Sequence, residues 1–295
     1  MEKGSGAEPW SVSQLSDMAA EEVKECQAQL GSVMADEDKL KVVWDELKEA
    51  YSGADKVPMS MIGYVGSVIP SADIAMLDLT TEDAVFELGM PMKMTEAQLD
   101  ALATRAKAQW SVLSGSAADY TADTVGTLGQ IICGMAPADV ASIPAARFKE
   151  AMTVLSEVYW CKQAVAEKLA DKAVAIYGEP STWGMSEVAG VGAVIGGLEA
   201  MKLKSIKDES MRGLSADGMM SIPPSKIAGL TKAQVLELST EAALAISDEQ
   251  MEKLPDDAKE ALLMVFEENL KSRSARSAAA GLSLLLLGVF AARLA

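Results

Sequence analysis

Carboxylates and cysteines are the side chains that could carry chemistry in this chain, because its 295 residues contain no histidine. The commonest general base near neutral pH is therefore missing, together with Ser-His and Cys-His nucleophile pairs and His-containing metal sites. Asp36, Glu37 and Asp38 could bind calcium weakly, but they lack the ligand order and central glycine of an EF-hand loop. We interpret them as a solvated loop, and we expect no enzyme activity and no metal site.

A glycine-rich stretch, "GVGAVIGG" at residues 190–197, partly matches the GxGxxG pattern of nucleotide-binding loops. Its third glycine is misplaced, no predicted strand precedes it, and no P-loop lysine follows. We therefore expect these glycines to serve helix packing, and we expect no cofactor.

The three cysteines, Cys26, Cys133 and Cys161, form no CxxC pattern, and an odd number cannot pair fully within the chain. Cys133 lies in the apolar run "IICGM", which favours a buried free thiol. A Cys133–Cys161 bridge in an oxidising compartment is the alternative, and the spacing alone does not decide between them.

The composition favours helices. Apolar residues make up 49% of the chain but aromatic residues only 5%, and the abundant Ala, Leu and Met lose little on entering a helix. The formal net charge of -17 argues against a nucleic-acid partner, which would need a basic face. It indicates a solvated acidic surface, or contact with a basic or calcium-bearing extracellular partner.

Three segments repeat at intervals of 63 residues: "IGYVGSVI" from Ile62, "VGTLGQII" from Val125 and "VAGVGAVI" from Val188. Apolar residues recur at the first, fourth and eighth positions, which is the spacing of one helix face. The fifth position is Gly66, Gly129 or Gly192. A glycine within a helix costs roughly 1 kcal/mol against alanine, so its recurrence predicts close approach of a neighbouring helix.

Two further elements recur. "SIPAARF" (142–148), "SIKDESM" (205–211) and "SIPPSKI" (221–227) predict turns or single-turn helices whose serine can cap and whose apolar ends are buried. Ser/Thr-x-x-Gln recurs at residues 11–14, 95–98, 231–234 and 247–250, and predicts four capping boxes at helix starts. Together the pieces predict an all-α fold, a superhelical array of short helices like an armadillo or HEAT solenoid. A compact helical domain is the alternative.

The C-terminal residues predict a lipid-anchor signal. An apolar stretch runs from Ala278 to Ala292. It is shorter than the about 20 residues of a transmembrane helix, but it fits the removable tail of a glycolipid-anchor (GPI) signal. Arg293, near the end of this tail, does not fit the pattern. The candidate attachment residues are Ser272, Ser274 and Ser277.

Two alternatives remain for this end: a short tail anchor with Lys271, Arg273 and Arg276 in the cytosol, or an ordinary buried helix. The N-terminal residues lack the apolar region of a secretory signal peptide, so the anchor interpretation requires such a signal in an upstream part of a longer gene product. We expect a disordered segment at 1–9, a helical-repeat domain at 10–270, and a small, basic and hydrophobic anchor segment at 271–295.

The segments "LGQIICGMAPADVASIPAARF" (128–148), "SIPPSKIAGLTKAQV" (221–235) and "WSVSQL" (10–15) resemble the mesothelin, stereocilin and otoancorin family. The resemblance spans roughly residues 10 to 270. It implies an array of armadillo-like repeats in a glycolipid-anchored surface protein that acts in adhesion, including attachment of extracellular gels to inner-ear sensory cells. The chain departs from the family in having one asparagine, Asn269, and no N-glycosylation site.

These observations lead to one functional hypothesis: a non-enzymatic, GPI-anchored cell-surface adhesion protein in the outer leaflet of the plasma membrane. Its helical-repeat surface would bind an extracellular protein, glycoprotein or matrix partner. The alternative hypothesis is a cytosolic or tail-anchored helical-repeat scaffold for protein–protein interaction.

Overall fold

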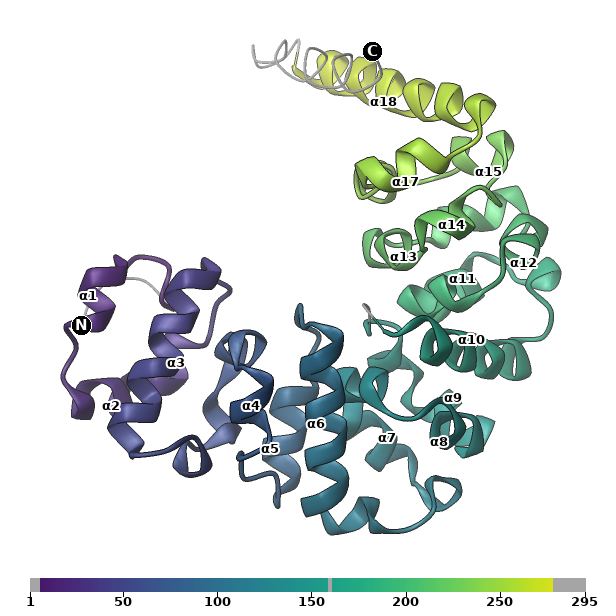
Figure 1. Cartoon of the computed structure of the whole chain (residues 1–295). Helices are drawn as coiled ribbons and strands as arrows, with labels where there is room; N and C mark the ends of the chain where they lie inside the picture. Colours follow the sequence, from purple (N-terminus) through teal and green to yellow (C-terminus); the bar gives the residue numbers. More distant parts are fainter. Residues whose placement is uncertain (1–5, 159–160, 278–295) are drawn as a thin grey trace. The chain divides into compact units, whose positions relative to one another are not determined.

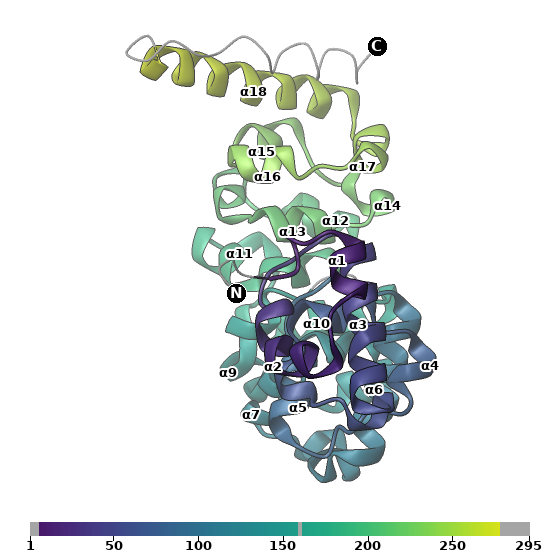
Figure 2. The ribbon, with the colours of Figure 1, turned by 90° about the vertical axis from the view of Figure 1, so that its left-hand side faces the viewer.

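The computed structural model describes residues 6–158 and 161–277, with side chains as far as Glu267 in the last helix. All regular secondary structure in these residues is helical, as short α-helices and 3-10 helices (η) packed together (Figures 1 and 2). The prediction of an all-helical array of short helices is confirmed. The chain divides into two compact units, one made of residues 1–179 and 190–198, the other of residues 180–189 and 199–295.

In the first unit, long α-helices alternate with shorter segments, each of which begins with a 3-10 helix. The long helices are α3 (Glu37–Tyr51), α6 (Glu96–Gln109) and α10 (Gln163–Tyr177). Between them lie η3 (Gly63–Val68) with α4 (Ser71–Ile74), and η6 (Gly129–Gly134) with α8 (Pro137–Ser142); η8 (Gly192–Gly197) follows. Each long helix contacts the pieces on either side of it, so these elements form one continuous row.

A second row in this unit contains α2 (Ala20–Leu30), η2 (Met59–Met61), α5 (Glu82–Gly89), α7 (Ala122–Leu128) and α9 (Ala145–Leu155). From η2 onwards, each member contacts the next, and α2 contacts α3 of the first row. The remaining short elements are α1 (Val12–Ser16), η1 (Ala54–Lys56), η4 (Ser111–Ser114) and η5 (Ala117–Asp119).

The second unit is built from shorter helices. Its elements are η7 (Pro180–Thr182), most of α11 (Met185–Val191), α12 (Ala200–Ser205), η9 (Asp208–Gly213), α13 (Ala216–Ser221), α14 (Pro224–Ile227), α15 (Lys232–Leu236), α16 (Thr240–Leu244), α17 (Asp248–Lys253) and α18 (Asp256–Ser277). Here α13 contacts α16, α14 contacts α17, and α15 contacts α18, so each of these three helices packs on the third one after it. Helices α13–α15 are therefore stacked on helices α16–α18.

The predicted division of the chain at residues 9 and 270 stays a prediction. Residues 6–9 of the N-terminal segment are described. Ala7 is buried there, and the backbone carbonyl of Glu8 accepts a hydrogen bond from Lys39 of α3 at 2.7 Å.

The nine apolar positions matched in the 63-residue repeat are all buried with no exposed surface: Ile62, Val65, Ile69, Val125, Leu128, Ile132, Val188, Val191 and Ile195. The expectation that each segment is one continuous helix is wrong, however. Helix α7 ends at Leu128 and α11 ends at Val191, and a 3-10 helix follows in both cases. The next residues, Gly129 and Gly192, have φ of +44° and +51°, a conformation that breaks the α-helix and that favours glycine.

The same glycines allow two backbones to come close together. A Cβ on Gly129 would overlap the carbonyl of Gly89, and a Cβ on Gly192 would overlap the carbonyl of Ser156. The predicted close approach of a neighbouring helix is thus confirmed at these two positions. In the first copy the corresponding residue is Gly63, with φ of +52°, whereas the aligned Gly66 meets only side chains.

We predict that Gly129→Ala destabilises the chain by roughly 3 kcal/mol or more, since it combines an unfavourable φ with a backbone overlap. Gly126→Ala is the matched control three residues earlier in α7, where a Cβ would meet no atom within 4 Å. It should be stabilising by up to about 1 kcal/mol. Chemical denaturation followed by circular dichroism measures the free energy of unfolding of both variants. Equal changes in the two would contradict a close backbone contact at Gly129.

All four predicted capping boxes are present, at the starts of α1, α6, α15 and α17. In α15, the Thr231 hydroxyl accepts from the Gln234 backbone N–H at 3.1 Å, and Gln234 Oε1 accepts from the Thr231 N–H at 3.0 Å. The box thus satisfies backbone donors that a helix start leaves without a partner.

Three of these glutamines also reach across to the preceding layer. Gln98, Gln234 and Gln250 are at most 8% exposed, and the Nε2 of each donates to two backbone carbonyls 28–31 residues earlier at 2.9 Å or less. We call this arrangement the glutamine clamp. Its acceptors, at 2.7–2.9 Å, are Ser67 and Ile69 for Gln98, Leu203 and Ile206 for Gln234, and Met219 and Ile222 for Gln250.

In two of the clamps, the glutamine donates to carbonyls at the recurrent Ser-Ile elements. Gln234 binds carbonyls on either side of Ser205, and Gln250 binds carbonyls on either side of Ser221. At the third element a lysine takes the place of the glutamine: Lys172 Nζ donates to the carbonyls of Ala141 and Ile143. The two recurrent motifs are therefore partners, one supplying the acceptors and the other the donor.

The prediction that the serines of these elements cap the following helix is wrong. Ser142, Ser205 and Ser221 are the last residues of α8, α12 and α13, and each hydroxyl donates to the carbonyl three residues earlier. Each serine thus satisfies an acceptor at the end of its own helix. The predicted burial of the apolar ends is confirmed for Ile143 and Phe148, Ile206 and Met211, and Ile222 and Ile227. The first element opens the 11-residue helix α9 instead of a single turn.

We predict that Gln234→Glu separates the two roles of the clamp. A glutamate still accepts from the cap N–H, as in an ordinary capping box, but it cannot donate to the carbonyls of Leu203 and Ile206. The free energy of unfolding should fall by roughly 2–4 kcal/mol, because buried acceptors lose their donors and face a carboxylate.

Gln14→Glu is the control for this substitution. Gln14 is exposed, and among the described residues its side chain bonds only to Ser11. The change there should stay within about 0.5 kcal/mol. A Gln234→Glu variant as stable as Gln14→Glu would show that the clamp carries no stability.

Candidate binding surface

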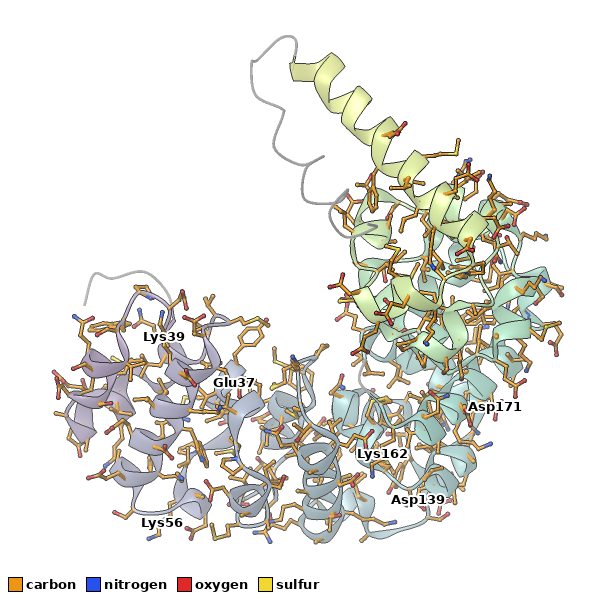
Figure 3. All side chains as sticks on the ribbon, turned by 45° about the horizontal axis from the view of Figure 1, so that its top comes forward. Glu37, Lys39, Lys56, Asp139, Lys162 and Asp171 are labelled. Carbon is orange, nitrogen blue, oxygen red and sulfur yellow. A yellow bond between two sulfur atoms is a disulfide. The ribbon has the colours of Figure 1, made fainter. Side chains whose placement is uncertain are left out.

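The described residues contain no cluster of three His, Cys, Asp or Glu side chains that could hold a metal ion. The interpretation of the acidic run as a loop is wrong for two of its residues, because Asp36 is the N-cap of α3 and Glu37 and Asp38 form its first turn. Glu37 pairs with Lys41 at 2.7 Å, and this hydrogen bond lowers the pKa of the Glu37 carboxyl from its ordinary value. The run is thus tied to neighbouring lysines; Figure 3 labels Glu37 and Lys39 at the start of α3.

The glycines of residues 190–197 pack against helices of the first unit. A Cβ on Gly197 would overlap the carbonyl of Ala166 in α10, just as one on Gly192 would overlap that of Ser156. The predicted role in packing is confirmed for Gly192 and Gly197, where a neighbouring backbone carbonyl fills the space beside the glycine.

An apolar groove of about 270 Å³ lies in the first unit, where the start of α3, η3 and the segment before α6 meet. We call it the methionine groove; its apolar lining is Met34, Ala35, Leu40, Tyr64, Val68, Met92 and Met94. Met92 and Met94 are buried in its wall, whereas Met34 is 61% exposed. Flexible thioether side chains adapt to differently shaped partners, so this groove suits an apolar side chain of another molecule.

The fold fixes the wall of this groove through two contacts. The Gln98 clamp ties the start of α6 to the carbonyls of Ser67 and Ile69. A Cβ on Gly66 would come within 3.0–3.2 Å of Leu88 and Met92, so the missing side chain lets Met92 pack onto η3. Glu37 and Lys93 also line the groove, one charge of each sign.

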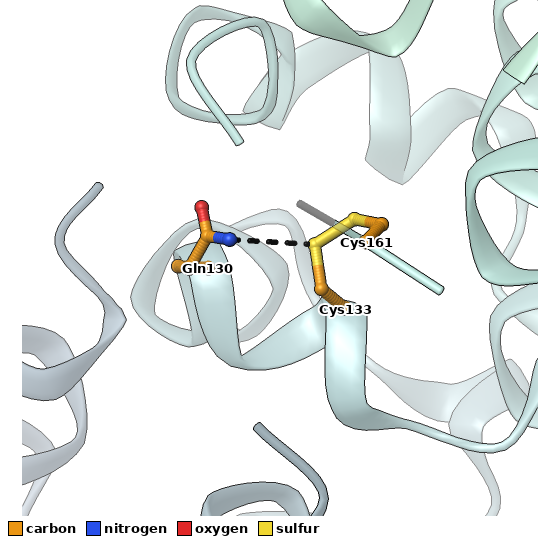
Figure 4. Close-up of a disulfide and its surroundings, with 3 residues drawn as sticks. All are labelled: Gln130, Cys133 and Cys161. Carbon is orange, nitrogen blue, oxygen red and sulfur yellow. Dashed lines mark hydrogen bonds between the residues drawn. A yellow bond between two sulfur atoms is a disulfide. The ribbon is translucent and has the colours of Figure 1, made fainter. Parts of the chain in front are cut away.

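A disulfide occupies the equivalent place one repeat later. Ser67 is the fifth residue of η3, and Met94 precedes the N-cap of α6. At the same positions in the next copy, Cys133 and Cys161 are bonded, with Cα atoms 4.4 Å apart (Figure 4). The prediction of a free Cys133 thiol is wrong, and the alternative bridge is the one that forms. Cys26 is free and half-buried.

The disulfide stabilises the part of the first unit that follows the groove. It joins residues 28 positions apart, the same spacing that the glutamine clamps cover. In the loop-entropy account, closing a loop of this size stabilises the folded chain by about 3–4 kcal/mol. Lys162, next to Cys161, also forms an ion pair with Asp100 of α6.

The candidate attachment residues Ser272, Ser274 and Ser277 belong to α18. They follow Glu267, the last residue of this helix whose side chain the structure describes. The apolar stretch from Ala278 lies outside the described residues. Within the part of the chain that is described, no helix is both long and apolar enough to span a bilayer.

Comparison with known proteins gives distant relatives. No protein-family model matches the chain. Otoancorin from Mus musculus is 20% identical over 189 residues, and otoancorin from Homo sapiens is 21% identical over 202 residues; these matches cover 64% and 65% of the chain. Human stereocilin is 27% identical over 161 residues, or 52% of the chain. The resemblance that the sequence motifs indicate is thus confirmed for otoancorin and stereocilin.

The chain matches only a small part of these relatives. The aligned segment is 16% of either otoancorin and 9% of stereocilin.

Proposed function

We propose that this chain is the contact-making part of a non-enzymatic adhesion protein, held at the cell surface by a GPI anchor. The observation that supports this best is the layered helical array itself, which presents an open apolar groove. The similarity to otoancorin and stereocilin favours the same class of function.

The disulfide favours an extracellular location of the protein over the cytosolic alternative. Stable disulfides form in oxidising compartments, and cytosolic thiols are kept reduced. Cys133 is fully buried in the bridge, where it supports packing between η6 and the start of α10. A cytosolic scaffold would lose this cross-link.

The partner, in this proposal, is an extracellular protein or glycoprotein of a matrix or a neighbouring cell. Its contact segment carries an apolar side chain for the methionine groove and basic residues around it. The net charge of -17 supports the basic character, because an acidic surface attracts and steers a basic partner.

The anchor is tested by enzymatic release. If Ser272, Ser274 or Ser277 carries a glycolipid, phosphatidylinositol-specific phospholipase should release most of the protein from intact cells expressing the complete gene product. Replacing all three serines by a bulky residue should abolish this release. Retention after treatment, with epitopes reachable only in permeabilised cells, would instead favour the tail-anchored scaffold.

The groove is tested by adhesion. Met34→Lys places a charge at the mouth of the methionine groove and should weaken binding to a matrix-coated surface about tenfold, roughly the value of one buried apolar contact. Met201→Lys is the control, because Met201 is 75% exposed in the second unit and does not line the groove. If the two variants bind equally well, the contact surface lies elsewhere.

A further inference from the structure

The last described helix of the second unit, α18, carries apolar side chains on more than one side. Ala258, Ala261 and Leu262 are buried, and the helix contacts α15 and α16. On other sides, Leu263 is 39% exposed and Met264 is 50% exposed. The outermost helix of a stacked array usually turns a polar face outward, so this helix retains apolar surface that a further segment can cover.

A groove of about 590 Å³ lies beside this surface, where α16, α17 and α18 meet. Its apolar lining is Ala243 from α16, Ile246 from the residues between α16 and α17, Met251 from α17, and Leu262, Leu263 and Phe266 from α18. All of these residues belong to the second unit. We call this the α18 groove.

The α18 groove is also negatively charged. Its lining includes the carboxylates of Asp248, Glu252 and Asp256 and a single cation, Lys259, which lies 3.4 Å from Asp256. An occupant that matches this lining is an apolar segment with a positive charge next to it.

The chain itself contains such a segment immediately after α18. Residues 282–290 read "LSLLLLGVF", and Arg293 follows three residues later. Arg293 is also the residue that does not fit a lipid-anchor signal. The segment is therefore apolar along its length and basic near its end, as the lining requires.

The tail is long enough to reach the groove. Phe266 lies 11 residues before Ser277, the end of α18, which corresponds to about 17 Å along the helix. The 18 residues 278–295 span about 27 Å even at helical rise, and more when extended. Because they are covalently attached, their effective concentration at the groove is high.

We propose that residues 282–290 dock in the α18 groove while they remain attached to the chain, with Arg293 near Asp248, Glu252 and Asp256. The groove then shields the most apolar segment of the chain from water. This inference does not rest on the proposed anchor; if anchor attachment removes the tail, the groove becomes vacant at that step.

The test is hydrogen–deuterium exchange of the purified full chain, without lipid, compared with Leu285→Asp/Leu286→Asp and with Arg293→Glu. In the leucine variant, amides of residues 243–266 should exchange roughly tenfold faster, because an aspartate cannot occupy an apolar groove. Arg293→Glu should have a smaller effect in the same peptides, and Glu252→Lys added to it should restore part of the protection. Peptides of α12, which belongs to the same unit as the groove but does not line it, report whether this unit is folded and should not change.

Three results would overturn the proposal. Exchange in residues 243–266 equal to that of the unaltered chain in both variants would show that the tail does not cover the groove. Protection that rises with protein concentration, together with a dimeric mass, would assign the groove to a second copy. Protection that appears only after phosphatidylcholine vesicles are added would place the tail in a bilayer. Phospholipase release from cells is unaffected by these outcomes, so the proposed function is tested separately.

Discussion

A buried glutamine amide with three hydrogen bonds is the interaction on which the layered structure depends. Short helices have many ends, and each end leaves backbone N–H or C=O groups without a partner. When layers stack, these groups are buried, and each unmet one costs about 1–3 kcal/mol. Gln234 and Gln250 satisfy an N–H at the start of their own helix and two carbonyls in the preceding layer. The clamp thereby fixes the register between layers as well as satisfying their ends.

In the first unit, two further features hold neighbouring layers close together: glycines with positive φ and a disulfide. Gly129 and Gly192 adopt positive φ, and their missing Cβ atoms leave room for the carbonyls of Gly89 and Ser156. The Cys133–Cys161 bridge cross-links the layer that follows the methionine groove. Where the bridge is absent, one repeat earlier, the same place in the fold is open and lined by thioethers. A difference between two repeats thus gives the array a candidate binding feature that its regular positions lack.

Local patterns in the sequence predicted local structure well. The four capping boxes form where Ser/Thr-x-x-Gln occurs, and the nine matched apolar positions are all buried. The break at Gly129 was missed because the apolar spacing of one helix face is also met by a short α-helix followed by a 3-10 helix.

The clamp and the methionine groove were not predicted, and the disulfide was predicted only as an alternative, because each joins residues that meet only after the layers stack. Nothing near Gln98 in the sequence points to Ile69, and the sequence separation of 28 between Cys133 and Cys161 does not by itself indicate a bridge. Met92 and Met94 look like ordinary core residues until η3 and α6 are placed beside them. The same contrast holds for function. The sequence motifs indicated a helical scaffold that makes contacts, whereas the proposed contact surfaces are formed only when its layers pack together.

The most direct measurement of the clamp is side-chain amide hydrogen exchange of the glutamines by NMR. We predict slow exchange of the Nε2 protons of Gln98, Gln234 and Gln250, which are buried and bonded to carbonyls, and fast exchange for the exposed Gln14. Exchange of the three buried amides as fast as that of Gln14 would contradict the claim that they hold the layers together.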